Sequence, residues 1–258
     1  MNAKALAWDA LGGTFWKQGR TSARPSAAEI QIFLSEIAAG ERCGILGAST
    51  KELIEAAVAC QLDVVVFDFS AVMIEELKSA IGENACTYVY LDLLDPIPAA
   101  LKRSVRFAIA DRLINRFSHH EVPAFFQNVL SLLSASGELR TTVKLGFYPM
   151  DLLLIEEGRR RGTLSRFYDE ETCTFDYASA REELEACLVA HGSIERNVLL
   201  DWYEGRGKES RFQDEGIQQQ LLDAKDGLRR FNLTEAVSCP DAPHTFMYRA
   251  GLVEAHEE

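Results

Sequence analysis

The stretch from Arg42 to Leu77, RCGILGASTKELIEAAVACQLDVVVFDFSAVMIEEL, decides the fold class of this chain. A short apolar segment, CGILG, is followed by a turn of small residues, a helix-like segment and then DVVVFDF. An almost unbroken apolar run of this kind is typical of a strand in the middle of a parallel sheet, which is buried on both faces. The stretch therefore predicts a β-α-β unit, with a second helix beginning after Ser70.

The same alternation continues as far as Gly146. The segments CTYVYLDL, VRFAIAD and ELRTTVKLG are strand-like, and SAVMIEELKSAIG and EVPAFFQNVLSLLSASG are helix-like. Strands that alternate with helices predict a parallel sheet with helices on both faces. Near the end of the chain, LTEAVSC and HTFMYRAGL flank the turn sequence PDAP, so we expect them to close the sheet as a hairpin.

We expect one domain over residues 1–258, because no segment has the composition of a linker. Ser26 and Glu29 have the spacing of a capping box and precede an apolar helix face, which predicts a helix before the first strand. The expected parts are a helical cap (1–40), a core (41–146), a helical lid (147–231) and a closing hairpin (232–258).

Composition excludes several classes of function. The net charge of −12 disfavours nucleic acid, because binding to it depends on neutralising phosphates. No apolar run reaches the roughly 18 residues of a membrane span, and the first residues lack the pattern of a secretory signal, so we expect a cytoplasmic protein. The 6 cysteines are scattered, which predicts free thiols and no metal site.

The turn after the first strand and the end of the second strand are the candidate binding elements. Parallel sheets bind ligands at the carboxyl ends of their strands, and an acidic residue there can accept both hydroxyls of a ribose. Asp68 follows Gly47 at about the 20-residue spacing that such sites have. The turn GAST has one glycine, so a pyrophosphate would fit poorly, whereas S-adenosylmethionine (SAM), which has none, is compatible. A β-α-β unit without a ligand is the alternative.

From about residue 44 to 146 the sequence resembles the class I SAM-dependent methyltransferases. ILGASTKEL is similar to a variant of their first motif, and VVVFDFSAVMIEEL closely resembles their V-x-x-x-D-x-S-x-x-M-I segment. VYLDLLDPIP, FAIADRLINRF and LLSASGELR resemble the three later motifs in the same order. The resemblance implies a doubly wound, mostly parallel, seven-stranded sheet with helical additions at the N-terminus and after the fifth strand.

The resemblance also assigns residues to the cofactor. Gly47, Ala48 and Ser49 would lie along the methionine part of SAM. Asp68 would bind the ribose, Phe69 and Met73 belong to the same motif, and Asp92 and Leu93 would face the adenine. Asp111 and Arg112 would begin the loop over the methionine amine and carboxylate. A local turn is the alternative role for Asp92, and a local ion pair is the alternative role for Asp111 with Arg112.

The substrate side is expected in the N-terminal and lid additions, which are rich in aromatic residues. Aromatic rings attract a sulfonium by cation–π interaction, and we take Tyr168 and Tyr203 as catalytic candidates. His119 follows the fourth strand and is the candidate base, with a solvent-exposed helix start as the alternative. We also expect Arg206 or Arg211 to bind an anionic group of a ligand, or else to lie in a surface loop.

We therefore predict an enzyme that uses SAM to methylate a small-molecule metabolite in a biosynthetic pathway. Two alternatives remain open, which are cyclisation of SAM with release of methylthioadenosine, to give azetidine-2-carboxylate, and SAM binding without catalysis. The expected partner is a small molecule, with no nucleic acid and no membrane, and the expected state is a monomer or a homodimer.

Overall fold

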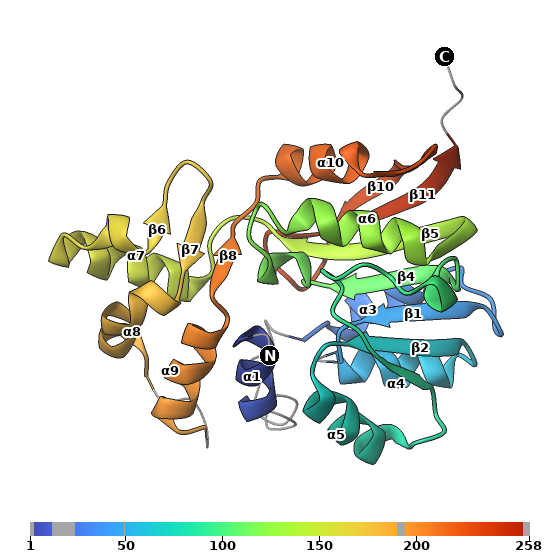
Figure 1. Cartoon of the computed structure of the whole chain (residues 1–258), viewed down its shortest axis with the longest axis horizontal. Helices are drawn as coiled ribbons and strands as arrows, with labels where there is room; N and C mark the ends of the chain where they lie inside the picture. Colours follow the sequence, from blue (N-terminus) through green and yellow to red (C-terminus); the bar gives the residue numbers. More distant parts are fainter. Residues whose placement is uncertain (1–2, 12–23, 49, 190–193, 255–258) are drawn as a thin grey trace.

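A large central sheet and a smaller unit beside it make up the chain (Figure 1). The computed structural model describes residues 3–11, 24–48, 50–189 and 194–254. The helices are α1 (Ala3–Leu11), α3 (Ala27–Leu34), α4 (Lys51–Ala59), α5 (Ala71–Ile81), α6 (Val122–Leu132), α7 (Pro149–Arg161), α8 (Arg181–Cys187), α9 (Arg196–Gly205) and α10 (Asp214–Asp223). No helix in these described ranges is long and apolar enough to cross a membrane.

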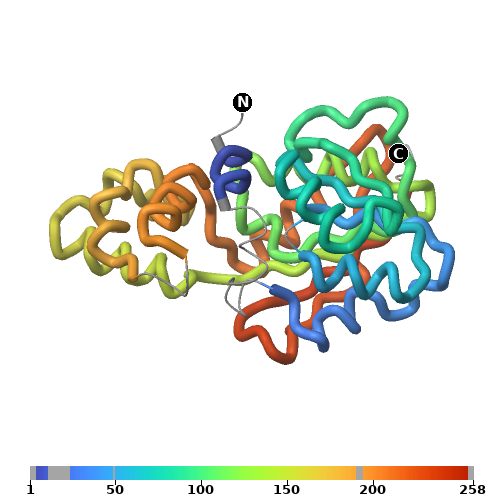
Figure 2. The backbone as a smooth tube through the Cα atoms, turned by 90° about the horizontal axis from the view of Figure 1, so that it is seen from below, coloured from blue at the N-terminus to red at the C-terminus, as the bar shows by residue number. Residues whose placement is uncertain are grey.

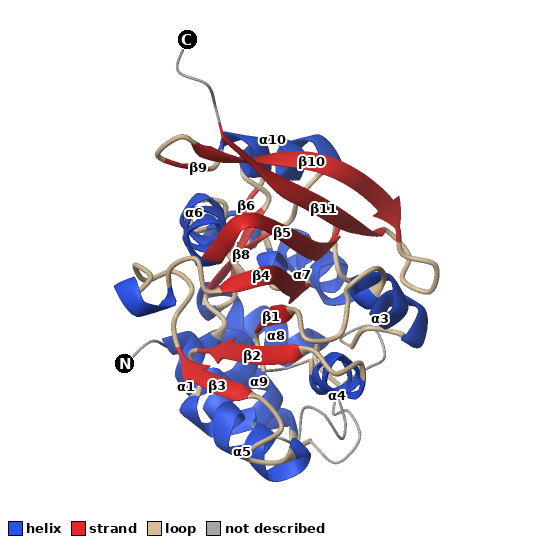
Figure 3. Ribbon diagram, turned by 90° about the vertical axis from the view of Figure 1, so that its right-hand side faces the viewer, coloured by secondary structure: helices blue, strands red, loops and turns tan. Residues whose placement is uncertain are grey.

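The central sheet has the strand order β3-β2-β1-β4-β5-β11-β10-β9 (Figure 3). Its strands are β1 (Arg42–Leu46), β2 (Asp63–Asp68), β3 (Thr87–Tyr90), β4 (Val105–Asp111), β5 (Leu133–Lys144), β9 (Lys225–Asp226), β10 (Arg229–Ser238) and β11 (Thr245–Glu254). Strands β1 to β5 pair in parallel, and β11 is antiparallel to β5 and β10. The mostly parallel sheet is confirmed, and the eighth strand, β9, is a two-residue edge segment that leaves no sequence pattern.

Alternating side chains fill a hydrophobic cluster on each face of this sheet. In β2, Val64 and Val66 pack with α3, α4 and α5, whereas Val65 and Phe67 pack with α6 and α10. Successive residues of a strand point to opposite faces, and both faces are covered here, which is why the strand is apolar throughout. The sequence pattern of a central parallel strand thus has its physical cause in two layers of helices.

Two serines set the starts of the helices that flank the binding elements. Ser26 accepts the N–H of Glu29, and the Glu29 carboxylate accepts the N–H of Ser26, so the capping box before α3 is confirmed. Ser70 accepts the N–H of Met73 at the start of α5. Such caps satisfy N–H groups that a helix leaves without partners.

Residues 147–210 form the smaller unit, which we call the insertion. It contains α7, α8, α9 and a three-stranded sheet of β6 (Tyr168–Asp169), β7 (Thr174–Asp176) and β8 (Lys208–Ser210). We expected helices alone here, and strands of this length carry too few residues for a period to be visible. The insertion has its own hydrophobic cluster, in which Gly158 touches the Phe167 ring so closely that a Cβ would lie 2.7 Å from it. Helix α10, expected within the lid, packs on α6 and β10 of the central sheet instead.

Helix α1 lies between the central sheet and the insertion, as both views of the chain show (Figures 1 and 2). On one side, Lys4 forms an ion pair with Glu121, with 2.9 Å between Nζ and Oε2. On the other side, the Trp8 ring packs edge-to-face on Trp202 of α9, with 5.7 Å between centroids. The helical N-terminal cap therefore joins the two parts of the molecule.

Candidate cofactor and substrate pocket

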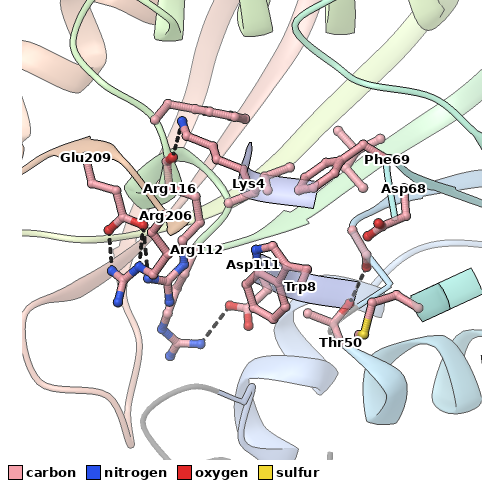
Figure 4. Close-up of a pocket in the computed structure, with 15 residues that line it drawn as sticks. Lys4, Trp8, Thr50, Asp68, Phe69, Asp111, Arg112, Arg116, Arg206 and Glu209 are labelled. Atoms are coloured by element: carbon pink, nitrogen blue, oxygen red, sulfur yellow. Dashed lines mark hydrogen bonds and ion pairs between the residues drawn. The ribbon is translucent and has the colours of Figure 1, made fainter. Parts of the chain in front are cut away.

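A pocket opens where the carboxyl ends of β1, β2 and β4 meet α1 and the insertion (Figure 4). This is the edge at which open parallel sheets bind their ligands. The lining residues come from the three strand ends (Leu46, Gly47, Thr50, Asp68, Phe69, Met73, Asp111, Arg112, Leu113, Arg116 and Phe117), from α1 (Lys4 and Trp8) and from the insertion (Arg206 and Glu209). The strand ends, α1 and the insertion thus each form one wall of the pocket.

Asp68 links the ends of the first two strands. Its Oδ2 accepts the N–H of Ala48 at 2.7 Å, and its Oδ1 accepts the N–H of Ser70 at 2.7 Å. Burial raises the pKa of Asp68 to about 6; the two N–H groups oppose this, and the carboxylates of Asp9 and Asp92 add to it. Each carboxylate oxygen has a second acceptor position, so Asp68 can still bind hydroxyl groups of a ligand.

The turn after β1 brings backbone, rather than side chain, up to the pocket. Gly47 has φ +101, a conformation that side chains rarely allow, and its N–H donates to the carbonyl of Phe67 at 2.8 Å. Thr50 donates its hydroxyl to the Gly47 carbonyl at 3.2 Å and stands at the start of α4. A small-residue turn before a helix suits a ligand that lies against the main chain.

A buried ionic network holds the loop after β4. Arg112 donates to Asp111 at 2.7 Å and also to Glu29 of α3. The Thr142 hydroxyl donates to Asp111 at 2.6 Å and accepts the N–H of Arg112 at 3.0 Å. Burial raises the pKa of Asp111 although Arg112 opposes it. The local ion pair, which was the alternative role for this dipeptide, exists, and Arg112 has a left-handed backbone conformation with φ +49.

Two buried arginines lie at this end of the insertion, Arg206 in the pocket wall itself and Arg211 directly after the insertion. Arg206 donates to Glu209 through Nε at 2.7 Å and also through Nη2, and its guanidinium carbon lies 4.6–4.8 Å from the rings of Tyr177, Trp202 and Tyr203. Arg211 donates to Asp151 at 2.6 Å. Three of the aromatic residues of the lid therefore pack around Arg206, a cation of the protein, and not around a ligand.

Glu209 is the acid at the centre of this wall. Burial opposes its ionisation, but the guanidinium groups of Arg206, Arg116 and Arg211 hold the pKa of Glu209 at about 2. A carboxylate with so low a pKa takes up a proton poorly near neutral pH, so Glu209 is unsuited to be a general base. Its role in this wall is to fix the arginines around it.

Most of the residues assigned to the cofactor meet at the pocket. Six of them line it, namely Gly47, Asp68, Phe69, Met73, Asp111 and Arg112. Ala48 is fully buried under the turn, and Ser49 lies outside the described residues. Asp92 accepts the N–H of Leu94 at 3.0 Å, which is the local turn that we weighed for it, and Leu93 is buried in the core. Neither Asp92 nor Leu93 is among the residues that line the pocket.

None of the three catalytic candidates is among the residues that line the pocket, although Tyr203 packs on one of them, Arg206. His119 is exposed, its Nδ1 is 3.1 Å from the Gln220 amide of α10, and its ring stacks on Phe212. Tyr168 packs on Phe175 within the insertion. Tyr203 packs on Trp202 and on the guanidinium of Arg206. Their assignment to catalysis stays a prediction.

Other lining residues were not singled out as site residues from the sequence. Lys4, Thr50, Arg116, Phe117 and Glu209 come from segments far apart in the chain, and only the fold brings them together. Arg116 and Phe117 had a usable signal, because they follow the acidic end of a predicted central strand within a few residues. Lys4 and Glu209 had none.

Comparison with solved structures finds a protein of similar sequence and others of the same fold. A Rhodobacter sphaeroides protein described as "Putative Zn-dependent Alcohol Dehydrogenases" has 42% identity and a TM-score of 0.93, over 98% of this chain and 99% of that one. The Burkholderia thailandensis 1,6-didemethyltoxoflavin-N1-methyltransferase, crystallised with S-adenosylhomocysteine, has 12% identity and a TM-score of 0.58, over 98% of this chain and 88% of that one. No family model and no curated protein match the chain.

A SAM-dependent methyltransferase from Methanosarcina mazei has 11% identity and a TM-score of 0.52, over 88% of this chain and 98% of that one. The chain therefore has the fold of the class I SAM-dependent methyltransferases, as expected. It belongs to the same family as the Rhodobacter sphaeroides protein, with which it aligns over almost its whole length.

Proposed function

We propose that this protein is a SAM-dependent methyltransferase that acts on a small molecule. The observation that carries the proposal is the position of Asp68, at the end of β2 beside the Gly47 turn and inside a pocket walled by three parts of the chain. The methyltransferase fold supports the same reading. Bound there, SAM would supply a methyl group on a positively charged sulfur.

The residues of the pocket fit the parts of that cofactor. The ionised Asp68 has free acceptor positions for two ribose hydroxyls, and Phe69 offers an aromatic face next to it. Gly47 gives room for a ligand against the main chain. Trp8 and Phe117 are the other aromatic rings among the lining residues, and they are available to shield a sulfonium from water.

The chain contributes to methyl transfer mainly by position. Holding two reactants in line supplies a large part of the rate of a displacement reaction. Helix α1 and the insertion both contribute side chains to the pocket at the strand ends, so a substrate there would be held and partly shielded from water. A base is not needed where the attacking atom carries a free lone pair.

The name of the Rhodobacter sphaeroides relative suggests a second activity, which the side chains of this protein do not favour. A catalytic zinc takes three protein ligands. Among residues 3–11, 24–48, 50–189 and 194–254, no group of three or more His, Cys, Asp or Glu side chains could hold a metal ion. The donor set for zinc is therefore missing from the described part of the chain.

Calorimetry with S-adenosylhomocysteine is the first test, followed by incubation with SAM and a library of metabolites. We expect binding, and release of S-adenosylhomocysteine with one class of metabolite, detected by mass spectrometry. Formation of methylthioadenosine from SAM alone would show that the reaction is cyclisation of SAM and not methyl transfer. Binding without any turnover would favour a non-catalytic role, and NAD-dependent oxidation of alcohols with bound zinc would overturn the proposal.

A further inference from the structure

Arg116 is a cation of the pocket whose guanidinium donates no hydrogen bond to any described residue. It ends a short helical turn after β4, lines the pocket, and its side chain is 21% exposed. The nearest acidic oxygen, Oε1 of Glu209, lies 3.6 Å from Nη1, which is too far for a hydrogen bond. The centroid of the Tyr148 ring lies 5.9 Å from the guanidinium carbon.

The other arginines of the pocket are already engaged. Arg112 donates to Asp111 and Glu29, and Arg206 makes two bonds to Glu209. Glu209 accepts from Arg206 through both oxygens and from Arg211 at 3.3 Å through Oε2, so one acceptor position, on Oε1, is left, and Arg116 has more donors than this oxygen can accept. Arg116 therefore differs from its neighbours in having donors available for a ligand.

The backbone that carries Arg116 is fixed on both sides. Its carbonyl accepts the Lys4 ammonium at 3.1 Å. The Asn115 side chain donates to the carbonyl of Lys144 at 2.8 Å and accepts the N–H of Lys144 at 2.9 Å. Because the backbone of Arg116 is already fixed, its guanidinium loses less conformational entropy when it binds a ligand, which favours affinity.

Most of the charged groups around Arg116 are paired with one another. Arg206 pairs with Glu209, Arg211 with Asp151, Lys4 with Glu121, and Arg112 with Asp111 and Glu29. Lys144 donates to a backbone carbonyl at 2.7 Å and has no carboxylate in ion-pair contact among the described residues. Arg116 and Lys144, which lie 5.9 and 6.0 Å from the centroid of the Tyr148 ring, are therefore the cations of this group with no described carboxylate at hydrogen-bond distance.

We propose that the second substrate of this enzyme carries a carboxylate and that Arg116 binds it. The inference rests on the proposed methyl transfer and names the class of acceptor, which is a small organic acid. A guanidinium presents a planar pair of N–H donors that matches the two oxygens of a carboxylate. Arg116 is then a substrate-binding residue at the insertion side of the pocket, opposite the Asp68 end.

Arg116→Gln tests the assignment, because it removes the charge and keeps most of the side-chain length. Arg230→Gln is the matched control, since Arg230 is exposed on β10 and does not line the pocket. Calorimetry with S-adenosylhomocysteine comes first for the wild type and both variants. We expect equal affinities, which also shows that Arg116→Gln is folded.

The probes for the substrate side are benzoate and benzamide, which have the same ring and differ in charge. Each is titrated into protein saturated with S-adenosylhomocysteine, and saturation-transfer NMR detects the binding. We expect benzoate to bind the wild type and Arg230→Gln, and to bind Arg116→Gln about tenfold or more weakly, as the loss of a hydrogen-bonded charge implies. Benzamide should bind all three proteins weakly and equally.

The outcomes separate this inference from the proposed function. Equal benzoate affinity in the wild type and Arg116→Gln overturns the inference and leaves methyl transfer intact. A loss of S-adenosylhomocysteine affinity in Arg116→Gln also overturns it, because Arg116 would then bind the carboxylate of the cofactor. A wild type that binds no S-adenosylhomocysteine overturns the proposed function, and benzoate titrated into the free protein would still measure the role of Arg116.

Discussion

Replacing Asp68 with alanine should separate the two roles of this carboxylate, in structure and in binding. In the folded chain it accepts the N–H groups of Ala48 and Ser70, each at 2.7 Å. Leaving two buried N–H groups without partners costs about 1–3 kcal/mol each. Against this, the pKa of Asp68 is raised to about 6, so holding the charge costs the fold about 3 kcal/mol at neutral pH.

These two contributions of Asp68 to stability have opposite signs and partly cancel, whereas nothing cancels its contribution to ligand binding. We expect Asp68→Ala to lower the free energy of unfolding by no more than about 3 kcal/mol. Two ribose hydroxyls bound to an ionised carboxylate are worth about 1.5–3 kcal/mol each, so the affinity for S-adenosylhomocysteine should fall by about 100-fold or more. The loss of affinity should therefore exceed the loss of stability.

Urea unfolding and calorimetry with S-adenosylhomocysteine at pH 7.5 measure the two effects in the same protein. Asp63→Ala is the control, because Asp63 begins the same strand, is exposed, and pairs with Arg42 at the surface. The control should change stability by less than about 1 kcal/mol and leave the affinity unchanged. An Asp68→Ala protein that is destabilised but binds within about threefold of the wild type would refute the placement of the ribose.

Three further outcomes follow from the structure. Arg211→Met leaves Asp151 as a buried charge without its main partner, and urea unfolding should show a loss of about 3–5 kcal/mol; a change below about 1 kcal/mol would contradict this. Gly158→Ala, with a Cβ 2.7 Å from a phenylalanine ring, should cost about 1–3 kcal/mol, whereas Gly216→Ala in α10, with open space around it, should not destabilise the protein. Folding raises the pKa of Asp68 from 3.8 to about 6, so the protonated side chain favours the folded state; this contribution to stability is complete below pH 3.8 and is lost as the pH rises through 6. The affinity for S-adenosylhomocysteine needs the ionised form and should rise about tenfold from pH 5 to 7.5. An affinity that does not change with pH would contradict this.

The sheet and its candidate cofactor edge were predictable because they depend on local patterns. Strands β1, β2 and β4 are buried on both faces, so their apolar runs are visible in the sequence. The position of Asp68 follows from the end of such a run, and the caps at Ser26 and Ser70 follow from spacing. Each of these features is decided within about 20 residues of chain.

The substrate side was not predictable in the same way, because it depends on the direction of side chains between distant segments. Tyr203 is next to Trp202 in the chain, and both rings face Arg206. His119 follows a central strand, as a base near the cofactor would, but Gln220 and Phe212 hold it at the surface. Sequence spacing places such residues on an element, and only tertiary packing decides which way they point.

Helix α1 has a consequence for the timing of the reaction. It spans 9 residues, too short to be stable alone, and it is held by Lys4 and Asp9 on the sheet side and by Trp8 on the insertion side. A ligand beneath it can leave only when these contacts separate. For the proposed methyl transfer we therefore expect the release of product, rather than the transfer of the methyl group, to limit turnover.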